Sequence, residues 1–222
     1  MKVAVIGAGG VGGYFGARLA QAGHDVTFVA RGRHLAAIRE HGLAIESALG
    51  DATVRCPATD DLSALGPVDV AMLCVKLWDV EATAPKLAGI VSNGGVVIPF
   101  QNGVESADRV AALLGPSHVL GGVAYIAATI RAPGVIAHTG TMARLRVGAF
   151  PGGPEDRAAA FADACRSAGV EIEHTPDIRR ALWEKFVFLA SFSGITSAAR
   201  SPIGVVRSDP DLRALLEAAM RE

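Results

Sequence analysis

A glycine-rich segment near the amino terminus constrains the fold of this chain more than any other feature. Lys2–Ile6 is a short apolar run, rich in β-branched residues, that ends directly at Gly7. Gly7, Gly9 and Gly12 follow the spacing G-x-G-x-x-G, and Ala17–Ala20 continues as a helix. In a strand–turn–helix unit these glycines permit a tight turn, the approach of a pyrophosphate to the backbone and close packing of helix on strand. The segment therefore predicts a dinucleotide site with the diphosphate at the helix N-terminus, the alternative being an ordinary glycine-rich turn. The other residues of this loop are Ala8, Gly10 and Val11.

The end of the second predicted strand indicates which dinucleotide binds. His24–Ala30 reads as this strand. An NAD site usually has Asp or Glu at that point to bind the ribose 2′-hydroxyl, but here Arg31-Gly32-Arg33 follows. A guanidinium suits a 2′-phosphate and cannot accept a hydrogen bond from a hydroxyl. Arg31 therefore favours NADP(H), although a solvated pair of surface arginines would give the same pattern.

The composition describes a globular protein with a substantial core. Of the 222 residues, 50% are hydrophobic and 19% charged, and the formal net charge of −1 implies no nucleic-acid partner. The three cysteines have no paired spacing and the six histidines are scattered, so neither disulfides nor a metal site is expected. The apolar stretch Phe186–Ile195 is too short to span a bilayer, and a strand at the start leaves no room for a signal peptide. We expect a cytoplasmic protein.

The first half of the chain alternates strand-like and helix-like segments. Strands are expected at Lys2–Ile6, His24–Ala30, Val68–Val75, Gly95–Phe100 and Val119–Ala127, helices at Leu35–Glu40, Val80–Ile90 and Val104–Leu114, and a strand within Leu43–Pro57. This rhythm predicts an α/β fold with a Rossmann-like, doubly wound parallel sheet. Ligands bind beyond the carboxyl ends of such strands. The glycine loop, Arg31, Lys76 and Gln101-Asn102-Gly103 are therefore expected to meet at one crevice.

The pattern changes after about Ile126. Val135–His138 and Leu145–Gly148 suggest a two-stranded ribbon around Thr139–Met142. The segments expected after it are a helix at Glu155–Ala168, a strand at Val170–His174, and helices at Ile178–Ala199 and Asp211–Arg221. We predict an NADP-binding Rossmann-like domain at residues 1–176 and the start of an incomplete, all-α substrate domain at residues 177–222. Two helices bury little core of their own, so they must dock on the first domain, pair with a second copy in a homodimer, or belong to a longer protein.

Two polar residues are candidates for chemistry at the crevice. Asn102 follows a predicted strand, where it could bond the cofactor ribose or a substrate oxygen, or serve only as an Asn-Gly turn. Lys185 lies early in an otherwise apolar helix. Partial burial would disfavour its charge and make it a usable proton donor, whereas a lysine that snorkels into water has no such role. Leu189 and Ser193 share its helix face.

Taken in order and separation, these motifs resemble ketopantoate reductase, the family of NADPH-dependent 2-dehydropantoate 2-reductases of pantothenate synthesis. They are Gly7-Ala8-Gly9-Gly10-Val11-Gly12, Arg31, Val75-Lys76, Gln101-Asn102-Gly103 and Leu182-Trp183-Glu184-Lys185, and the resemblance continues to about Gly204. It implies that Arg31 and Lys76 hold the phosphates of the cofactor and that Ala128 touches it through the backbone. By the same resemblance, Asn102 lies between cofactor and substrate, and Lys185 is the general acid that protonates the alkoxide formed by hydride transfer to a 2-oxo acid.

The chain departs from this family at its substrate positions. The family carries asparagines one and two helical turns after its lysine, where this chain has Leu189 and Ser193, and a third that aligns with Ile203. Ser193 is expected to bind substrate in place of its asparagine. The resemblance implies 2-dehydropantoate, but the lost amides favour a bulkier or more apolar 2-oxo acid. The family's later helices would follow Glu222, so we expect a truncated chain that has low activity alone.

Two other functions fit the same residues. A β-hydroxyacid dehydrogenase also joins a Rossmann domain to a helical domain with a lysine, and strict oxidation of a 3-hydroxy acid would favour it. A non-catalytic NADPH-binding module would bind the cofactor tightly, turn over no oxo acid and be indifferent to Lys185→Ala. In every case a small molecule is the expected partner, with neither nucleic acid nor membrane.

Overall fold

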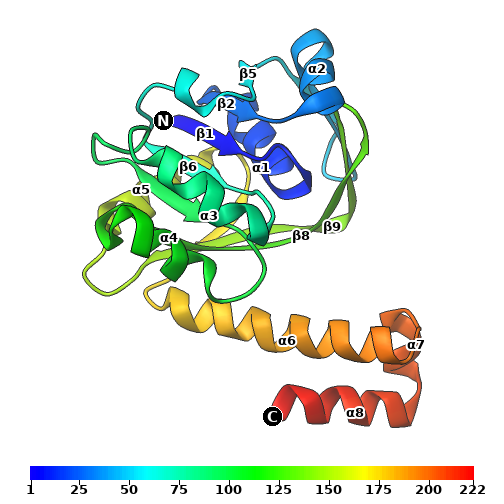
Figure 1. Cartoon of the computed structure of the whole chain (residues 1–222). Coiled ribbons are helices and arrows are strands. Elements are labelled where there is room, and N and C mark those ends of the chain that lie inside the picture. Colours follow the sequence, from blue (N-terminus) through cyan, green and yellow to red (C-terminus); the bar gives the residue numbers. More distant parts are fainter.

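The computed structural model describes all 222 residues, and its first layer is a five-stranded parallel sheet (Figure 1). Its strands are β1 (Lys2–Ile6), β2 (Asp25–Val29), β5 (Ala58–Thr59), β6 (Val70–Leu73) and β7 (Val96–Pro99). They lie in the order β5-β2-β1-β6-β7, and every pairing is parallel. The chain reverses its direction of winding between β1 and β6, which is the position where such sheets bind ligands. The predicted Rossmann-like fold is confirmed.

Alternate residues of the central strands face two separate cores. Val3 and Val5 belong to a cluster of 33 buried residues, whereas Ala4 and Ile6 belong to a cluster of 15. The larger cluster includes side chains of helices on one face of the sheet, α1 (Gly10–Gln21), α2 (Gly32–His41) and α5 (Glu155–Ser167). The smaller one includes side chains of α3 (Val80–Thr83) and α4 (Ser106–Leu114). Because both faces are covered, the strands are continuous apolar runs.

A second sheet packs beside the first and contains a strand that we expected elsewhere. Its strands are β3 (Leu43–Ser47), β4 (Ala52–Val54), β8 (Leu120–Ala132), β9 (Val135–Ala149) and β10 (Glu171–His174), in the order β10-β9-β3-β4 with β8 paired to β9. Val119–Ala127 was expected in the doubly wound sheet. This segment meets that sheet only at a bridge between Val97 and Val119, and then leaves it to pair antiparallel with β9.

The predicted ribbon around Thr139–Met142 is wrong. Val135–His138 and Leu145–Gly148 are two parts of the single strand β9, and both pair with β8. The turn of the hairpin lies at Pro133-Gly134, where Gly134 has a φ of 77° that favours glycine. Residues 139–142 form a bulge, because the pairing of β8 jumps from Ile126–Ala143 to Ala128–His138. His138 Nε2 lies 3.1 Å from the carbonyl oxygen of Met142 across this bulge.

Proline explains two further differences in the helices. The predicted helix Val80–Ile90 contains the short α-helix α3, followed by a 3-10 helix at Ala84–Leu87. Pro85 has no N–H to donate to the preceding turn, so it interrupts the α-helix. Pro202 has the opposite effect, because a helix can begin after a proline. The short helix α7 (Ile203–Ser208), which we had expected to be a connection, starts directly after it.

At the bottom of Figure 1, in orange and red, a long helix runs below the second sheet and a shorter one folds back beside it. They are α6 (Ile178–Ala198) and α8 (Pro210–Arg221), joined through α7. Ile178, Ala181 and Leu182 of α6 form a small buried cluster with Val123 of β8, so this helix docks on the preceding part of the chain. A β-carbon on Gly121 would lie 2.4 Å from Ile178, so a larger residue would push α6 away from the sheet. None of the helices is both long and apolar enough to cross a membrane.

Candidate active site

The glycine loop leaves an open position at the N-terminus of α1. Gly7 has a φ of 104°, and a β-carbon there would lie 2.9 Å from the backbone of Cys74. A β-carbon on Gly12 would lie 2.3 Å from the carbonyl oxygen of Gly7. At Gly9, in contrast, no atom lies within 4 Å of an added β-carbon. Two glycines thus serve close packing, while the third faces empty space, as the sequence spacing predicts for a loop that admits a ligand.

The first turn of α1 also has free hydrogen-bond donors. No group of the protein accepts a hydrogen bond from the backbone N–H of Gly10, Val11 or Gly12. Such donors at a helix N-terminus, together with the helix dipole, bind anions such as phosphate. The loop therefore offers both the space and the donors that a diphosphate requires.

A groove of about 960 Å³ extends from this loop along the carboxyl ends of β1, β2 and β6. It brings together five of the residues expected at the cofactor site: Gly7, Ala8, Gly9, Arg31 and Lys76. Gly10, Val11, Gly12, Ala128 and Asn102 do not line it. Gly10 instead packs against β8, because a β-carbon on it would lie 2.0 Å from the carbonyl oxygen of Ala128. Ile130, two residues further along β8, does line the groove.

Some charged side chains of the groove are already paired within the protein, and others are not. Arg31 lies 4.0 Å from the carboxylate of Asp79, and its side chain is 74% exposed. Lys76 and Lys86 form no ion pair within the chain. Asp60 and Asp61 are already engaged, the first with Arg39 and the second as an acceptor from Ser63. A bound phosphate would therefore meet two unpaired lysines and an arginine that shares its charge with Asp79.

Sequence reasoning missed a histidine that supports the glycine loop. His34 Nε2 lies 2.7 Å from the carbonyl oxygen of Ala8, and its Nδ1 accepts a hydrogen bond of 2.9 Å from the N–H of Gly134. The imidazole thus joins the glycine loop to the β8–β9 turn, although Gly134 lies 100 residues after His34 in the chain. No local pattern indicates this role, because the contact depends on the β8–β9 hairpin, whose turn at Gly134 is far from His34 in the chain.

The turn that carries Asn102 is held by the side chain before it. Gln101 Nε2 donates hydrogen bonds of 2.9 Å to the carbonyl oxygens of both Leu73 and Val75. These bonds tie the segment after β7 to the end of β6, directly before Lys76. Gly103 follows with a φ of 107°. The motif Gln101-Asn102-Gly103 therefore fixes the position of Asn102 relative to the groove.

Lys185 of α6 reaches this turn. Its Nζ donates hydrogen bonds to Asn102 Oδ1 at 2.8 Å and to the carbonyl oxygen of Ala124 at 2.6 Å. It also lies 5.7 Å from the centre of the Tyr125 ring. Burial lowers the pKa of Lys185 from 10.5 to about 8, because the charged form loses solvation. The lysine is thus directed inward, as the proton-donor hypothesis requires, and does not snorkel into water.

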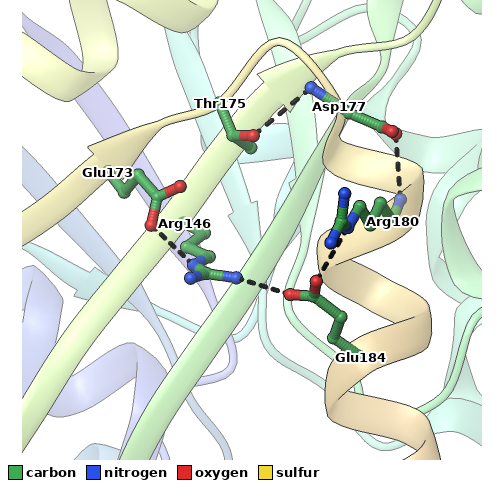
Figure 2. A network of polar contacts seen from close by, with 6 residues as sticks. All are labelled: Arg146, Glu173, Thr175, Asp177, Arg180 and Glu184. Carbon is green, nitrogen blue, oxygen red and sulfur yellow. Dashed lines mark hydrogen bonds and ion pairs between the residues drawn. The ribbon is translucent and has the colours of Figure 1, made fainter.

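A chain of ion pairs fixes the helical turn from which Lys185 extends (Figure 2). Arg146 of β9 contacts Glu173 at 2.7 Å and Glu184 at 3.0 Å, and Arg180 contacts the same Glu184 at 2.9 Å. The two arginines lower the pKa of Glu184, which keeps this carboxylate charged. Asp177 caps α6 by accepting a hydrogen bond of 3.0 Å from the N–H of Arg180. The carboxylate of Glu184 therefore bonds both to strand β9 and to the first turn of its own helix, and Lys185 is the next residue.

A second cavity of about 600 Å³ lies between the Asn102 turn and α6. Leu189 and Ser193, the two residues one and two turns after Lys185, both line it. Ile203, the third substrate position of the sequence analysis, does not. Lys76 lines the groove and its chain neighbour Leu77 lines the cavity, so the two lie on either side of this short segment, whereas Lys185 itself lines neither.

Comparisons with known proteins agree with this arrangement. The family "Ketopantoate reductase PanE/ApbA" matches residues 3–152, and its C-terminal counterpart matches residues 177–222. A 2-dehydropantoate 2-reductase of Archaeoglobus fulgidus is 34% identical over 95% of this chain and 68% of its own length. The oxidoreductase YkpB of Bacillus subtilis is 31% identical over 93% of this chain and 68% of its own.

Solved structures give the same result. The crystal structure of 2-dehydropantoate 2-reductase from Geobacter metallireducens superposes with a TM-score of 0.92 at 30% identity, covering 99% of this chain and 73% of that one. The sequence resemblance to this family is thus confirmed. Since these matches span both the sheet region and the helical region, the chain belongs to the ketopantoate reductase family, whose members are dinucleotide-binding oxidoreductases that act on CH–OH groups.

Proposed function

We propose that this chain reduces a 2-oxo acid to a 2-hydroxy acid with NADPH, and that 2-dehydropantoate is the substrate that its relatives suggest. The observation that carries the proposal is the contact of 2.8 Å between Lys185 Nζ and Asn102 Oδ1, at a residue that lines the cavity next to α6. A proton donor and an orienting amide are the groups that carbonyl reduction needs.

The groove has the features that a dinucleotide phosphate requires. The space at Gly9 and the free N–H groups of Gly10, Val11 and Gly12 would receive the diphosphate. Arg31 and Lys76 would bind the remaining phosphate charge, and the guanidinium favours the 2′-phosphate of NADPH over the hydroxyl of NADH. Ile130 would form the wall of β8 against the cofactor, and the backbone of Ala128, which packs on Gly10, would touch it at the glycine loop. NADPH, when bound, supplies the hydride for the keto carbon.

Lys185 acts on the oxygen of the same carbonyl group. Its ammonium donates a hydrogen bond to the keto oxygen, stabilises the negative charge that develops there, and transfers a proton to it. With a pKa of about 8, the lysine is protonated at neutral pH and yet gives up its proton more readily than an exposed lysine. Asn102 holds the ammonium through its Oδ1 and leaves its amide N–H₂ for the substrate. Ser193 would provide a hydroxyl further along the cavity.

The two parts of the chain have different tasks in this proposal. Residues 1–176 contain both sheets and would bind the cofactor, and residues 177–222 supply Lys185 and one wall of the cavity. The network of Arg146, Glu173 and Glu184 connects the two parts next to Lys185 (Figure 2).

The test is a pair of measurements on the purified chain. NADPH and NADH binding is measured by nicotinamide fluorescence, and NADPH oxidation is followed with 2-dehydropantoate and a panel of other 2-oxo acids. The proposal predicts tighter binding of NADPH and oxidation that depends on a 2-oxo acid. NADP⁺ reduction by 3-hydroxy acids alone would instead identify a β-hydroxyacid dehydrogenase, and tight NADPH binding with no turnover would identify a non-catalytic module.

A further inference from the structure

Six of the ten residues that line the cavity beside Asn102 are hydrophobic. Its lining is formed by two segments, the turn after β7 and one face of α6, together with Leu77. The apolar side chains are Leu77, Val104, Phe186, Leu189, Ala190 and Phe192. A cavity of about 600 Å³ is large enough for a small organic acid with an extended side chain.

The cavity has few polar groups, and some of them are already engaged, which leaves the amide N–H₂ of Asn102 and the hydroxyl of Ser193. Glu105 contacts Arg109 at 2.6 Å, and Asn102 Oδ1 accepts the hydrogen bond from Lys185. The hydroxyl of Ser193 lies two helical turns beyond the lysine and is the one hydroxyl of the lining. A polar substituent of a substrate would therefore find few partners here, and leaving a hydroxyl unpaired on binding costs affinity.

The position of Lys185 determines which part of a substrate enters the cavity. Asn102 both lines the cavity and holds the ammonium that would bind the keto oxygen. Leu189 follows Lys185 by one helical turn, on the same face. When the keto oxygen of a 2-oxo acid lies at Lys185, the substituent on its keto carbon can therefore reach the apolar wall.

We propose that this cavity selects 2-oxo acids whose substituent is a branched or aromatic hydrocarbon, in preference to hydroxylated ones such as 2-dehydropantoate. The inference rests on the proposed function for the place of the keto group, but it concerns only the substituent. Leu189 is then a specificity-determining residue, because its side chain lines the cavity one helical turn after the proton donor and on the same face of α6.

The test measures binding and does not depend on turnover. The chain is saturated with NADP⁺, which cannot reduce a 2-oxo acid, and titrated calorimetrically with 4-methyl-2-oxopentanoate, phenylpyruvate and 2-dehydropantoate. We expect at least one of the hydrocarbon acids to bind about tenfold or more tightly than 2-dehydropantoate, since one well-placed apolar group contributes about this factor. Equal or tighter binding of 2-dehydropantoate would overturn the inference, as would the absence of binding by all three acids.

Variants locate the effect. Leu189→Asn is expected to reduce the preference for hydrocarbon substituents severalfold or to reverse it, while the matched Leu215→Asn on the exposed surface of α8 leaves the ratio unchanged. An unchanged ratio in Leu189→Asn, in a variant whose circular dichroism is that of the parent chain, contradicts the assigned role. If the parent chain itself fails to bind NADP⁺ or to oxidise NADPH, the proposed function fails and not the inference about the substituent. Repeating the titrations without cofactor shows whether the acids bind independently of it, which separates the two failures.

Discussion

Lys185 Nζ lies 2.8 Å from Asn102 Oδ1, although 83 residues separate the two in the chain. The same ammonium reaches the carbonyl oxygen of Ala124, so the turn after β7, strand β8 and helix α6 meet at one nitrogen. Burial at this meeting point lowers the pKa of the lysine to about 8. The fold thus places a proton donor with a lowered pKa against Asn102, a residue of the cavity wall.

Removal of this donor should abolish most of the activity. Lys185→Ala is expected to lower kcat by about 100-fold to 10,000-fold, the usual contribution of a general acid, with little change in NADPH affinity. Steady-state kinetics and fluorescence titration measure the two effects. Lys2→Ala, at the exposed amino end of β1, is the matched control. A parallel loss of cofactor affinity in Lys185→Ala would indicate a structural role.

The rate of reduction should depend on pH through the same lysine. Only the protonated amine can donate, so kcat/KM for the 2-oxo acid is expected to fall as the pH rises through about 8. A lysine with the ordinary pKa of 10.5 would keep the rate constant well beyond that point. The pH profile between 6 and 10 distinguishes the two, and a flat profile up to pH 9.5 would show that burial does not shift this group as described.

Asn102 offers a way to move that profile. Asn102→Asp places a carboxylate next to the ammonium, which favours the charged lysine and raises its pKa by about one unit or more. The alkaline limb of the pH profile should move to higher pH by the same amount. Asn102→Ala, which removes the acceptor without adding charge, should not raise it. Equal profiles for the two variants would mean that residue 102 does not contact the donor.

Replacing each of two neighbouring glycines by alanine should impair different properties, stability in one case and NADPH affinity in the other. In Gly10→Ala the new β-carbon would lie 2.0 Å from the carbonyl oxygen of Ala128, so α1 and β8 must separate, at a cost of about 1–3 kcal/mol in the free energy of unfolding. In Gly9→Ala the β-carbon meets no protein atom, so stability is kept while NADPH affinity falls. Urea denaturation and fluorescence titration compare the variants. Unimpaired NADPH binding by Gly9→Ala would place the diphosphate elsewhere.

The choice between NADPH and NADH should depend on Arg31 and its neighbour. Arg31→Ala is expected to weaken NADPH binding by about tenfold or more and to leave NADH nearly unchanged, because only NADPH carries the 2′-phosphate. Asp79 lies 4.0 Å from this guanidinium, so Asp79→Asn should strengthen NADPH binding by removing a competing negative charge. Dissociation constants for both cofactors test this. Equal losses for NADPH and NADH in Arg31→Ala would contradict the assignment.

The parts of the site that depend on local sequence could be predicted. The strand–glycine–helix unit at Gly7 to Gly12 and the Asn-Gly turn at residues 102 and 103 are encoded within a few residues and were found, whereas the sequence around Lys185 left open whether it points inward or into water. The bulge at residues 139–142, the packing of Gly10 on Ala128 and the support from His34 depend on pairings between distant segments. No periodicity records these pairings, so the β8–β9 hairpin was placed wrongly.

The substrate positions show the same limit. Leu189 and Ser193 were placed correctly near Lys185 because helical spacing alone puts them on its face. Ile203, the third substrate position that the resemblance implies, does not line the cavity, and it begins the short helix α7, which the sequence did not predict.

The most direct test of the account is a single-turnover experiment with the chain in excess over NADPH, which detects even slow chemistry. NADPH absorbance is followed after addition of 2-dehydropantoate or a hydrocarbon 2-oxo acid, for the parent chain and for Lys185→Ala. We predict that the parent chain oxidises the bound NADPH in the presence of a 2-oxo acid and that Lys185→Ala, with cofactor bound, does so at least about 100-fold more slowly. Equal rates in the two proteins, or no oxidation by the parent chain with any 2-oxo acid, would contradict the central role of Lys185.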